Sequence, residues 1–375
     1  MARCLNVLGR PACLAALLAS LWIGGAAAHW QANLDVMNQV PPPTEEAVAM
    51  LEGATGVFTM WEGAAGTINW NLAVKGVTNM TMAHIHIGNA TTSGDVSVFL
   101  VPVGEKPGKD GSLPMLDPPV TEMMYTASSS FKAKDVGGGL TLKELLALAS
   151  TGGVYVNVHT TEYPGGAIRG QIMEASAWMS TLTPGNQVPT PLTEADVNGA
   201  AAKFTLTMVE GEDIYGYTLE VMDVENMTMA HIHAGNSTTN GGVVVILAPV
   251  GGMMEGDNLP MLMPAESGSL KFTGFFTNDD IMVVNATDFL DMLMMDPSSA
   301  FYVNVHTEAY PAGAIRGQLM TVNDMGDDMG GMEPSMEPSM APEMAPTPTM
   351  APTGGAGRIG FSMAALAAAL AAMLL

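Results

Sequence analysis

The sequence contains very little cysteine and little positive charge. Only 2 Cys occur, Cys4 and Cys13, so a disulfide-stabilised scaffold is excluded. Lys and Arg number 13 against 37 Asp and Glu, which gives a formal net charge of −24. This balance argues against nucleic acid as a partner, because phosphate binding requires a basic surface. Hydrophobic residues still make up 48% of the chain, enough to build packed cores.

Several catalytic signatures are also absent from the sequence. It contains no Gly-x-Ser-x-Gly nucleophile motif, no phosphate-binding loop and no dinucleotide-binding fingerprint. These absences favour a protein without catalytic activity.

The first 28 residues have the pattern of a secretory signal peptide. Arg3 and Arg10 supply positive charge, a short apolar stretch follows, and the small residues Ala26–Ala28 provide a cleavage site. Cleavage there removes both cysteines, so the mature chain contains no thiol. It also makes His29 the new N-terminus, where the amine and the ring form a candidate copper chelate.

The C-terminal end has the pattern of a membrane-attachment signal. Residues 359–375 are apolar, no basic residue follows them, and small residues precede them at 353–357. We predict that 354–375 is a GPI-attachment signal, with a single transmembrane segment as the alternative. The predicted location is the outer face of the plasma membrane.

Residues 323–353 differ in composition from the rest of the chain. Proline recurs at short intervals between acidic residues and methionines, which favours an extended, disordered stalk over helix or sheet. The stalk methionines are interpreted as spacer residues. Collection of copper by their thioethers, or absorption of oxidants, is the alternative.

The middle of the chain is an internal repeat. Three segments return at a constant offset of 147 residues, which indicates two copies of one domain. We place module 1 at 30–175 and module 2 at 177–322. The repeated segments are 79–86 and 226–233, 155–160 and 302–307, and 163–171 and 310–318.

Each module is predicted to be all-β, a β-sandwich with one short helix. Val154, Val156 and Val158 alternate with polar residues, and a Pro-Gly-Gly turn follows, so 154–172 is expected to form a hairpin. Short runs of strand-forming residues with Gly and Pro turns are typical of sandwiches. Further strands are expected at 67–74, 203–209 and 243–247.

The helix of module 1 is expected to begin after Thr141, which forms a capping-box pattern with Glu144. Module 2 has its counterpart at 288–294. The methionines of that region are predicted to fill gaps in the core. They are Met292, Met294 and Met295.

The repeated segments resemble the CHRD (chordin) domain family. The likeness implies a secreted, immunoglobulin-like or related β module. In chordin such modules belong to an extracellular antagonist of growth factors, but this chain lacks the cysteine-rich repeats of chordin, so growth-factor binding is not inferred. The segments that carry the resemblance are 40–42, 84–88 and 156–171 in module 1, and 188–189, 231–235 and 303–318 in module 2.

This chain departs from the family pattern beside the repeated arginines. The family's usual acidic residue before Ile-Arg-Gly is Ala167 in module 1 and Ala314 in module 2. Arg169 and Arg316 are structural-motif residues in this resemblance, so any partner they have must come from elsewhere in the fold.

Six of the 7 histidines occupy repeat-equivalent positions. A His-x-His pair places both rings on one face of a strand, and a third histidine on a neighbouring strand completes a three-nitrogen set suited to zinc or copper. A purely structural role in fixing the hairpin is the favoured reading. The motif also resembles part of the copper/zinc superoxide dismutase ligand set. The candidate ligands are His84, His86, His159, His231, His233 and His306.

Five Asn-x-Ser/Thr sequons predict surface glycosylation of an exported chain. The primary hypothesis is therefore a cell-surface glycoprotein that binds or adheres to an unknown extracellular protein or glycan, without catalysis and without a cofactor. Metal binding, with copper or zinc as cofactor, is the second hypothesis, and a superoxide-handling enzyme is the third. The sequons are at Asn79, Asn89, Asn226, Asn236 and Asn285.

Overall fold

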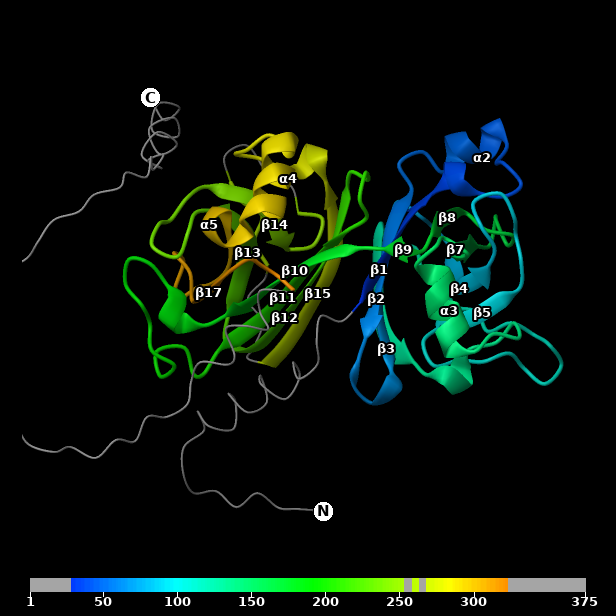
Figure 1. The fold of residues 1–375 in the computed structure, drawn as a ribbon, viewed down its shortest axis with the longest axis horizontal. Coiled ribbons are helices and arrows are strands. Elements are labelled where there is room, and N and C mark those ends of the chain that lie inside the picture. The colour runs from blue at the N-terminus through cyan, green and yellow to red at the C-terminus, as the bar shows by residue number, and fades with distance from the viewer. Residues whose placement is uncertain (1–27, 253–257, 263–267, 323–375) are drawn as a thin grey trace, which may run out of the picture. The chain divides into compact units, whose positions relative to one another are not determined.

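The structure is a computed structural model that describes residues 28–252, 258–262 and 268–322 (Figure 1). The expected signal peptide, stalk and C-terminal attachment signal lie outside the described residues. Within the described part of the chain, no helix has both the length and the apolar character needed to cross a bilayer.

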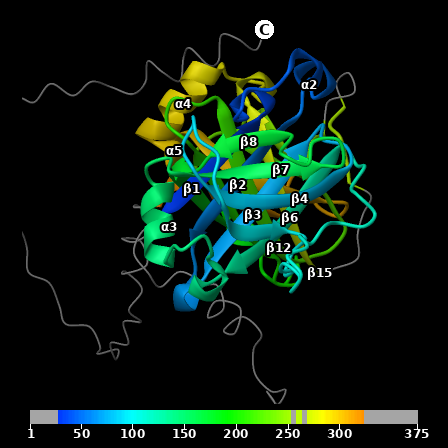
Figure 2. The same cartoon turned by 90° about the vertical axis from the view of Figure 1, so that its right-hand side faces the viewer.

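Module 1 is built from antiparallel strands in the order β5-β4-β7-β8-β1-β2-β3-β6, with β9 paired to β1. The series turns a corner between β8 and β1, which are paired only at Arg169 and Asp35. Figure 2 shows β8, β7 and β4 side by side. The strands are β1 (His29–Asp35), β2 (Thr55–Glu62), β3 (Ile68–Lys75), β4 (Met80–Ile87), β5 (Val96–Val101), β6 (Met124–Phe131), β7 (Val154–Thr160), β8 (Ile168–Gln171) and β9 (Met173–Glu174).

Module 2 repeats this topology. One sheet has the order β15-β12-β11-β10-β18 and the other has the order β14-β13-β16-β17. A single bridge from Thr183 to Arg316 stands where β1 and β8 meet in module 1. The strands are β10 (Ser176–Leu182), β11 (Ala201–Met208), β12 (Ile214–Val224), β13 (Met227–Ala234), β14 (Val243–Ala248), β15 (Gly268–Thr277), β16 (Phe301–Thr307), β17 (Ile315–Gln318) and β18 (Met320–Thr321).

Each module has its own hydrophobic core. The core of module 1 takes residues from both sides of the corner, such as Phe58 and Trp70 from β2 and β3, and Ile85 and Val156 from β4 and β7. The core of module 2 is formed in the same way within residues 178–319. The prediction of a duplicated β-sandwich is confirmed.

The hairpin predicted at 154–172 is present as β7 and β8. Its valines face the core, as expected from strand alternation. The opposite face is also buried, because loops fold over it: Gln39 Nε2 donates to Asn157 Oδ1, and Asn157 Nδ2 donates to the Gly165 carbonyl. This covered outer face carries the histidines.

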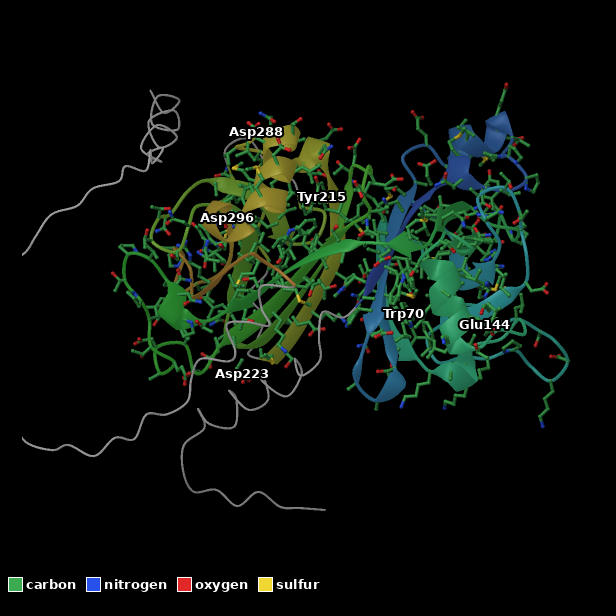
Figure 3. All side chains as sticks on the ribbon, in the orientation of Figure 1. Trp70, Glu144, Tyr215, Asp223, Asp288 and Asp296 are labelled. Atoms are coloured by element: carbon green, nitrogen blue, oxygen red, sulfur yellow. The ribbon has the colours of Figure 1, made fainter. Side chains whose placement is uncertain are left out.

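The capping-box helix is present as α3 (Leu142–Ala149), where Thr141 Oγ1 accepts from the Glu144 N–H and the Glu144 carboxylate accepts from the Thr141 N–H. Its counterpart is α4 (Ala286–Met295). Glu144 and Asp288 lie on the exposed sides of these helices (Figure 3). Two further short helices are α2 (Glu45–Met50) and α5 (Pro297–Ala300).

The prediction that the α4 methionines fill the core is wrong for two of the three. Met294 is 55% exposed and Met295 is 85% exposed, whereas Met292 packs against the core. The buried positions of α4 are Phe289 and Leu293, four residues apart on one face. Positions 294 and 295 lie off that stripe, because each residue turns the helix by about 100°.

Candidate metal centre

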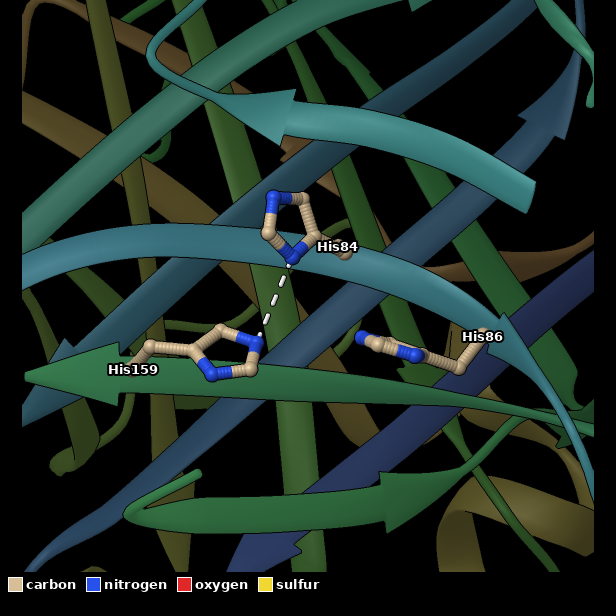
Figure 4. Close-up of side chains that lie close together, drawn as sticks. All are labelled: His84, His86 and His159. Atoms are coloured by element: carbon tan, nitrogen blue, oxygen red, sulfur yellow. Dashed lines mark hydrogen bonds between the residues drawn. The ribbon is translucent and has the colours of Figure 1, made fainter. Parts of the chain in front are cut away.

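Three histidines meet on the outer face of the β4–β7 pair in module 1. His84 and His86 come from β4 and His159 comes from β7 (Figure 4). One ring nitrogen from each of the three lies within 4.8 Å of the others. The fold therefore brings together the three histidines that the sequence grouped as candidate ligands, His84, His86 and His159.

Backbone carbonyls fix the orientation of two of the three rings. His86 Nδ1 lies 3.0 Å from the Gly94 carbonyl oxygen, and His159 Nδ1 lies 3.0 Å from the Pro164 carbonyl oxygen. A carbonyl oxygen only accepts, so each Nδ1 carries the proton and each Nε2 keeps a free lone pair. Hydrogen bonds of this kind orient ligand histidines in metal sites.

The third ring is oriented toward the other two. His84 Nδ1 lies 3.3 Å from His159 Nε2. Figure 4 shows the His86 ring with a nitrogen directed toward the space between these two rings. In the metal-free protein His84 Nδ1–H donates to His159 Nε2. His86 Nε2 is then a buried acceptor with no hydrogen-bond partner among the described residues. Such an atom destabilises a fold by about 1–3 kcal/mol unless something binds it.

The three imidazoles are neutral at physiological pH. Burial lowers the pKa of His84 to about 3, with the neighbouring His159 and His86 contributing further. Burial also lowers the pKa of His159 to about 4 and lowers the pKa of His86. Metal ligation requires the neutral ring, so no proton has to be displaced from an imidazolium at pH 7.

Module 2 reproduces this arrangement with independent residues. His231 Nδ1 lies 3.3 Å from His306 Nε2, and His233 Nε2 is again a buried nitrogen without a hydrogen-bond partner in the described part of the chain. His233 Nδ1 donates to the Gly241 carbonyl at 3.1 Å, and His306 Nδ1 donates to the Pro311 carbonyl at 3.0 Å. Burial lowers the pKa of His231 to about 3 and that of His233 to about 4.

The spacing of these nitrogens suits a transition-metal ion. Two nitrogens bound tetrahedrally at about 2.0–2.1 Å from zinc lie about 3.3–3.4 Å apart. The separation of 3.3 Å between His84 Nδ1 and His159 Nε2 has this value. Three imidazoles leave one position open on a four-coordinate ion.

A buried arginine supports the site from one side. The Arg169 guanidinium lies 3.5 Å from the centroid of the Tyr155 ring, and that ring stacks on His86 with 5.0 Å between centroids. Arg169 donates to the carbonyl oxygens of Asn89 at 2.6 Å and Thr92 at 3.0 Å. It thereby fixes the loop that leads to Gly94, the acceptor for His86.

Arg316 makes the equivalent contacts in module 2, to the Asn236 and Thr239 carbonyls and over the Tyr302 ring. The expectation that the arginine partners come from elsewhere than Ala167 and Ala314 is borne out. In both modules the hydrogen-bond acceptors found among the described residues are carbonyl, amide and hydroxyl oxygens rather than carboxylates.

His29, the candidate N-terminal copper chelator, lies at the start of β1. It is 4% exposed and is paired with Trp61 of β2. The structure therefore places it in a sheet and apart from both histidine clusters.

None of the five sequon asparagines is buried. Asn285 also caps α4 by accepting from the Asp288 N–H. Glycosylation of these positions stays a prediction. The five are Asn79, Asn89, Asn226, Asn236 and Asn285.

The sequence did not reveal the tyrosines that stack on the histidines or the carbonyls that orient them. Tyr155 and Tyr302 were visible only as repeated residues. Gly94 and Pro164 lie five or more residues from the rings they fix, and only the folded loops bring them into contact.

The fold and the site together define a class of protein. It consists of a duplicated all-β module that carries a three-histidine cluster on its outer sheet face. A family model described as the CHRD domain matches residues 30–172 and 178–319. The chain belongs to the CHRD domain family, with two tandem copies. No curated protein matches the chain.

Proposed function

We propose that this protein is an extracellular, non-catalytic binding protein, and that each module binds one zinc or copper ion through its three histidines. The observation that carries the proposal is the buried Nε2 of His86, and of His233 in module 2. Each belongs to a cluster of three histidines and has no hydrogen-bond partner among the described residues. A bound metal ion accepts this lone pair and so gives the buried nitrogen a partner.

The extracellular part of the proposal rests on two observations. The sequence begins with a signal-peptide pattern, and the CHRD domain is consistent with an extracellular domain family. A GPI-anchored position at the cell surface is part of the same proposal. Adhesion to an extracellular protein or glycan stays a prediction from the sequence.

The test is the metal content of the purified protein after incubation with zinc or copper and removal of excess metal. We expect about one equivalent per module. The double variant His84→Ala/His231→Ala removes one ligand from each cluster and should bind less than a tenth as much. His29→Ala changes the one histidine outside the clusters, tests the N-terminal candidate separately, and should bind as the unmodified protein does.

A protein that binds neither zinc nor copper at micromolar concentration would contradict the proposal. Metal retained in full by the double variant would also contradict it, because the metal would then lie elsewhere in the chain.

A further inference from the structure

A methionine lies beside the histidine cluster in each module and is not part of the core. Met82 is 6% exposed, yet it is absent from the hydrophobic cluster that contains its strand neighbours Met80, Ala83 and Ile85. Met229 is likewise outside the core that contains Met227, its counterpart of Met80. Burial of Met82 is therefore not explained by core packing.

Strand alternation places this methionine on the histidine face, because Met82 stands two residues before His84 on β4. The register between β4 and β7 shifts between Met80 and Met82. Without the shift, Met80 would share this face with Met82, and the shift instead lets Met80 turn into the core. Met82 stays on the face of His84 and is paired with His159 across the ladder. Bulges re-aim side chains next to functional sites.

The same bulge occurs in module 2, between Met227 and Met229. Met229 stands two residues before His231 and is paired with His306 across the ladder. The arrangement therefore belongs to the module and not to one copy of it.

One side of the module 1 cluster is apolar. The Phe99 ring packs edge-on against His84, with 4.8 Å between centroids. Among the described residues, the groups able to hold a metal consist of histidines alone, without a carboxylate. Neutral imidazoles and a thioether are ligands that suit a soft, monovalent cation, and thioethers select Cu(I).

We propose that the ion held in each module is copper in the Cu(I) state, and that Met82 in module 1 and Met229 in module 2 are the fourth ligands. The inference rests on the proposed function, since it assigns the open position of the same three-histidine site. It also assigns copper rather than zinc to the site, because a thioether is not a favoured ligand of zinc.

The experiment compares two double variants of the full protein. Met82→Leu/Met229→Leu removes both thioethers and keeps side-chain volume. Met80→Leu/Met227→Leu makes the same change on the same strands, toward the core. Cu(I) affinity is measured by competition with a chromophoric Cu(I) chelator under ascorbate, and Zn(II) affinity by competition with a zinc indicator. The methionines of residues 323–353 are identical in all variants.

We expect the first variant to lose at least tenfold in Cu(I) affinity and to keep its Zn(II) affinity within twofold. The second variant should keep both. X-ray absorption of the unmodified Cu(I) protein should show a copper–sulfur contribution that the first variant lacks.

Two results overturn the inference while leaving the metal site intact: an unchanged Cu(I) affinity in the first variant, or an equal loss of Cu(I) and Zn(II) affinity. An unmodified protein that binds neither ion overturns the proposed function and this inference together.

Discussion

At the scale of single residues, the metal centre depends on hydrogen bonds to backbone carbonyls. His86 and His159 are oriented by Gly94 and Pro164, and Arg169 fixes the loop that carries Gly94. Side chains of one sheet face are thus held in place by the main chain of the loops that cover it. No carboxylate among the described residues is hydrogen-bonded to the three rings; the charged group that acts on the ligand geometry is Arg169, through the loop it holds.

Loss of Arg169 should be costly although this residue is not part of the hydrophobic core. Arg169→Met leaves the Asn89 and Thr92 carbonyls without their donor. We expect the free energy of unfolding of module 1 to fall by about 2–4 kcal/mol, since hydrogen bonds to a charged group contribute about 1.5–3 kcal/mol each. Urea denaturation followed by tryptophan fluorescence measures this.

The matched control for this variant is Lys106→Met, which removes the exposed ion pair with Asp135. It should cost less than about 1 kcal/mol. Equal losses in the two variants would show that Arg169 contributes no more than a surface cation.

At the scale of secondary-structure elements, the sequence predicted what local patterns determine. The β7–β8 hairpin followed from alternating valines and a Pro-Gly-Gly turn, and α3 followed from its capping box. The outward exposure of Met294 and Met295 was missed, because apolar character alone does not give the direction of a side chain on a helix. That direction is set by which face of α4 meets the sheet.

The α4 helix offers a direct comparison of buried and exposed apolar residues. Leu293→Ala should destabilise module 2 by about 2–5 kcal/mol, because it opens a cavity in the core. Met295→Ala should change stability by less than about 0.5 kcal/mol, since its side chain is 85% exposed. Thermal unfolding of both variants measures the difference, and similar shifts in melting temperature would contradict the observed orientation of the helix.

At the scale of the whole molecule, the constant offset of the repeats was sufficient to predict two copies of one fold. The six candidate ligands were also identified from the sequence, because the repeat marks them twice. The convergence of three nitrogens, the stacking of Tyr155 on His86 and the bulge at Met82 depend on strand register, which the sequence does not display.

The duplication predicts that the two metal sites are independent. His84→Ala alone should lower the metal content from about two ions per chain to about one, because each module supplies all three of its own histidines. His231→Ala alone should have the same effect. Metal analysis of each single variant checks this, and loss of both ions from one variant would indicate a shared site.

The contacts of Arg169 and Arg316 have a consequence for sequence divergence. Both arginines hold their loops mainly by main-chain oxygens, which every amino acid provides. The position after each loop asparagine has already diverged, to Ala90 in one copy and Ser237 in the other. Relatives of this chain are expected to vary at that position and to retain the asparagine and threonines whose side chains close the loop in both copies.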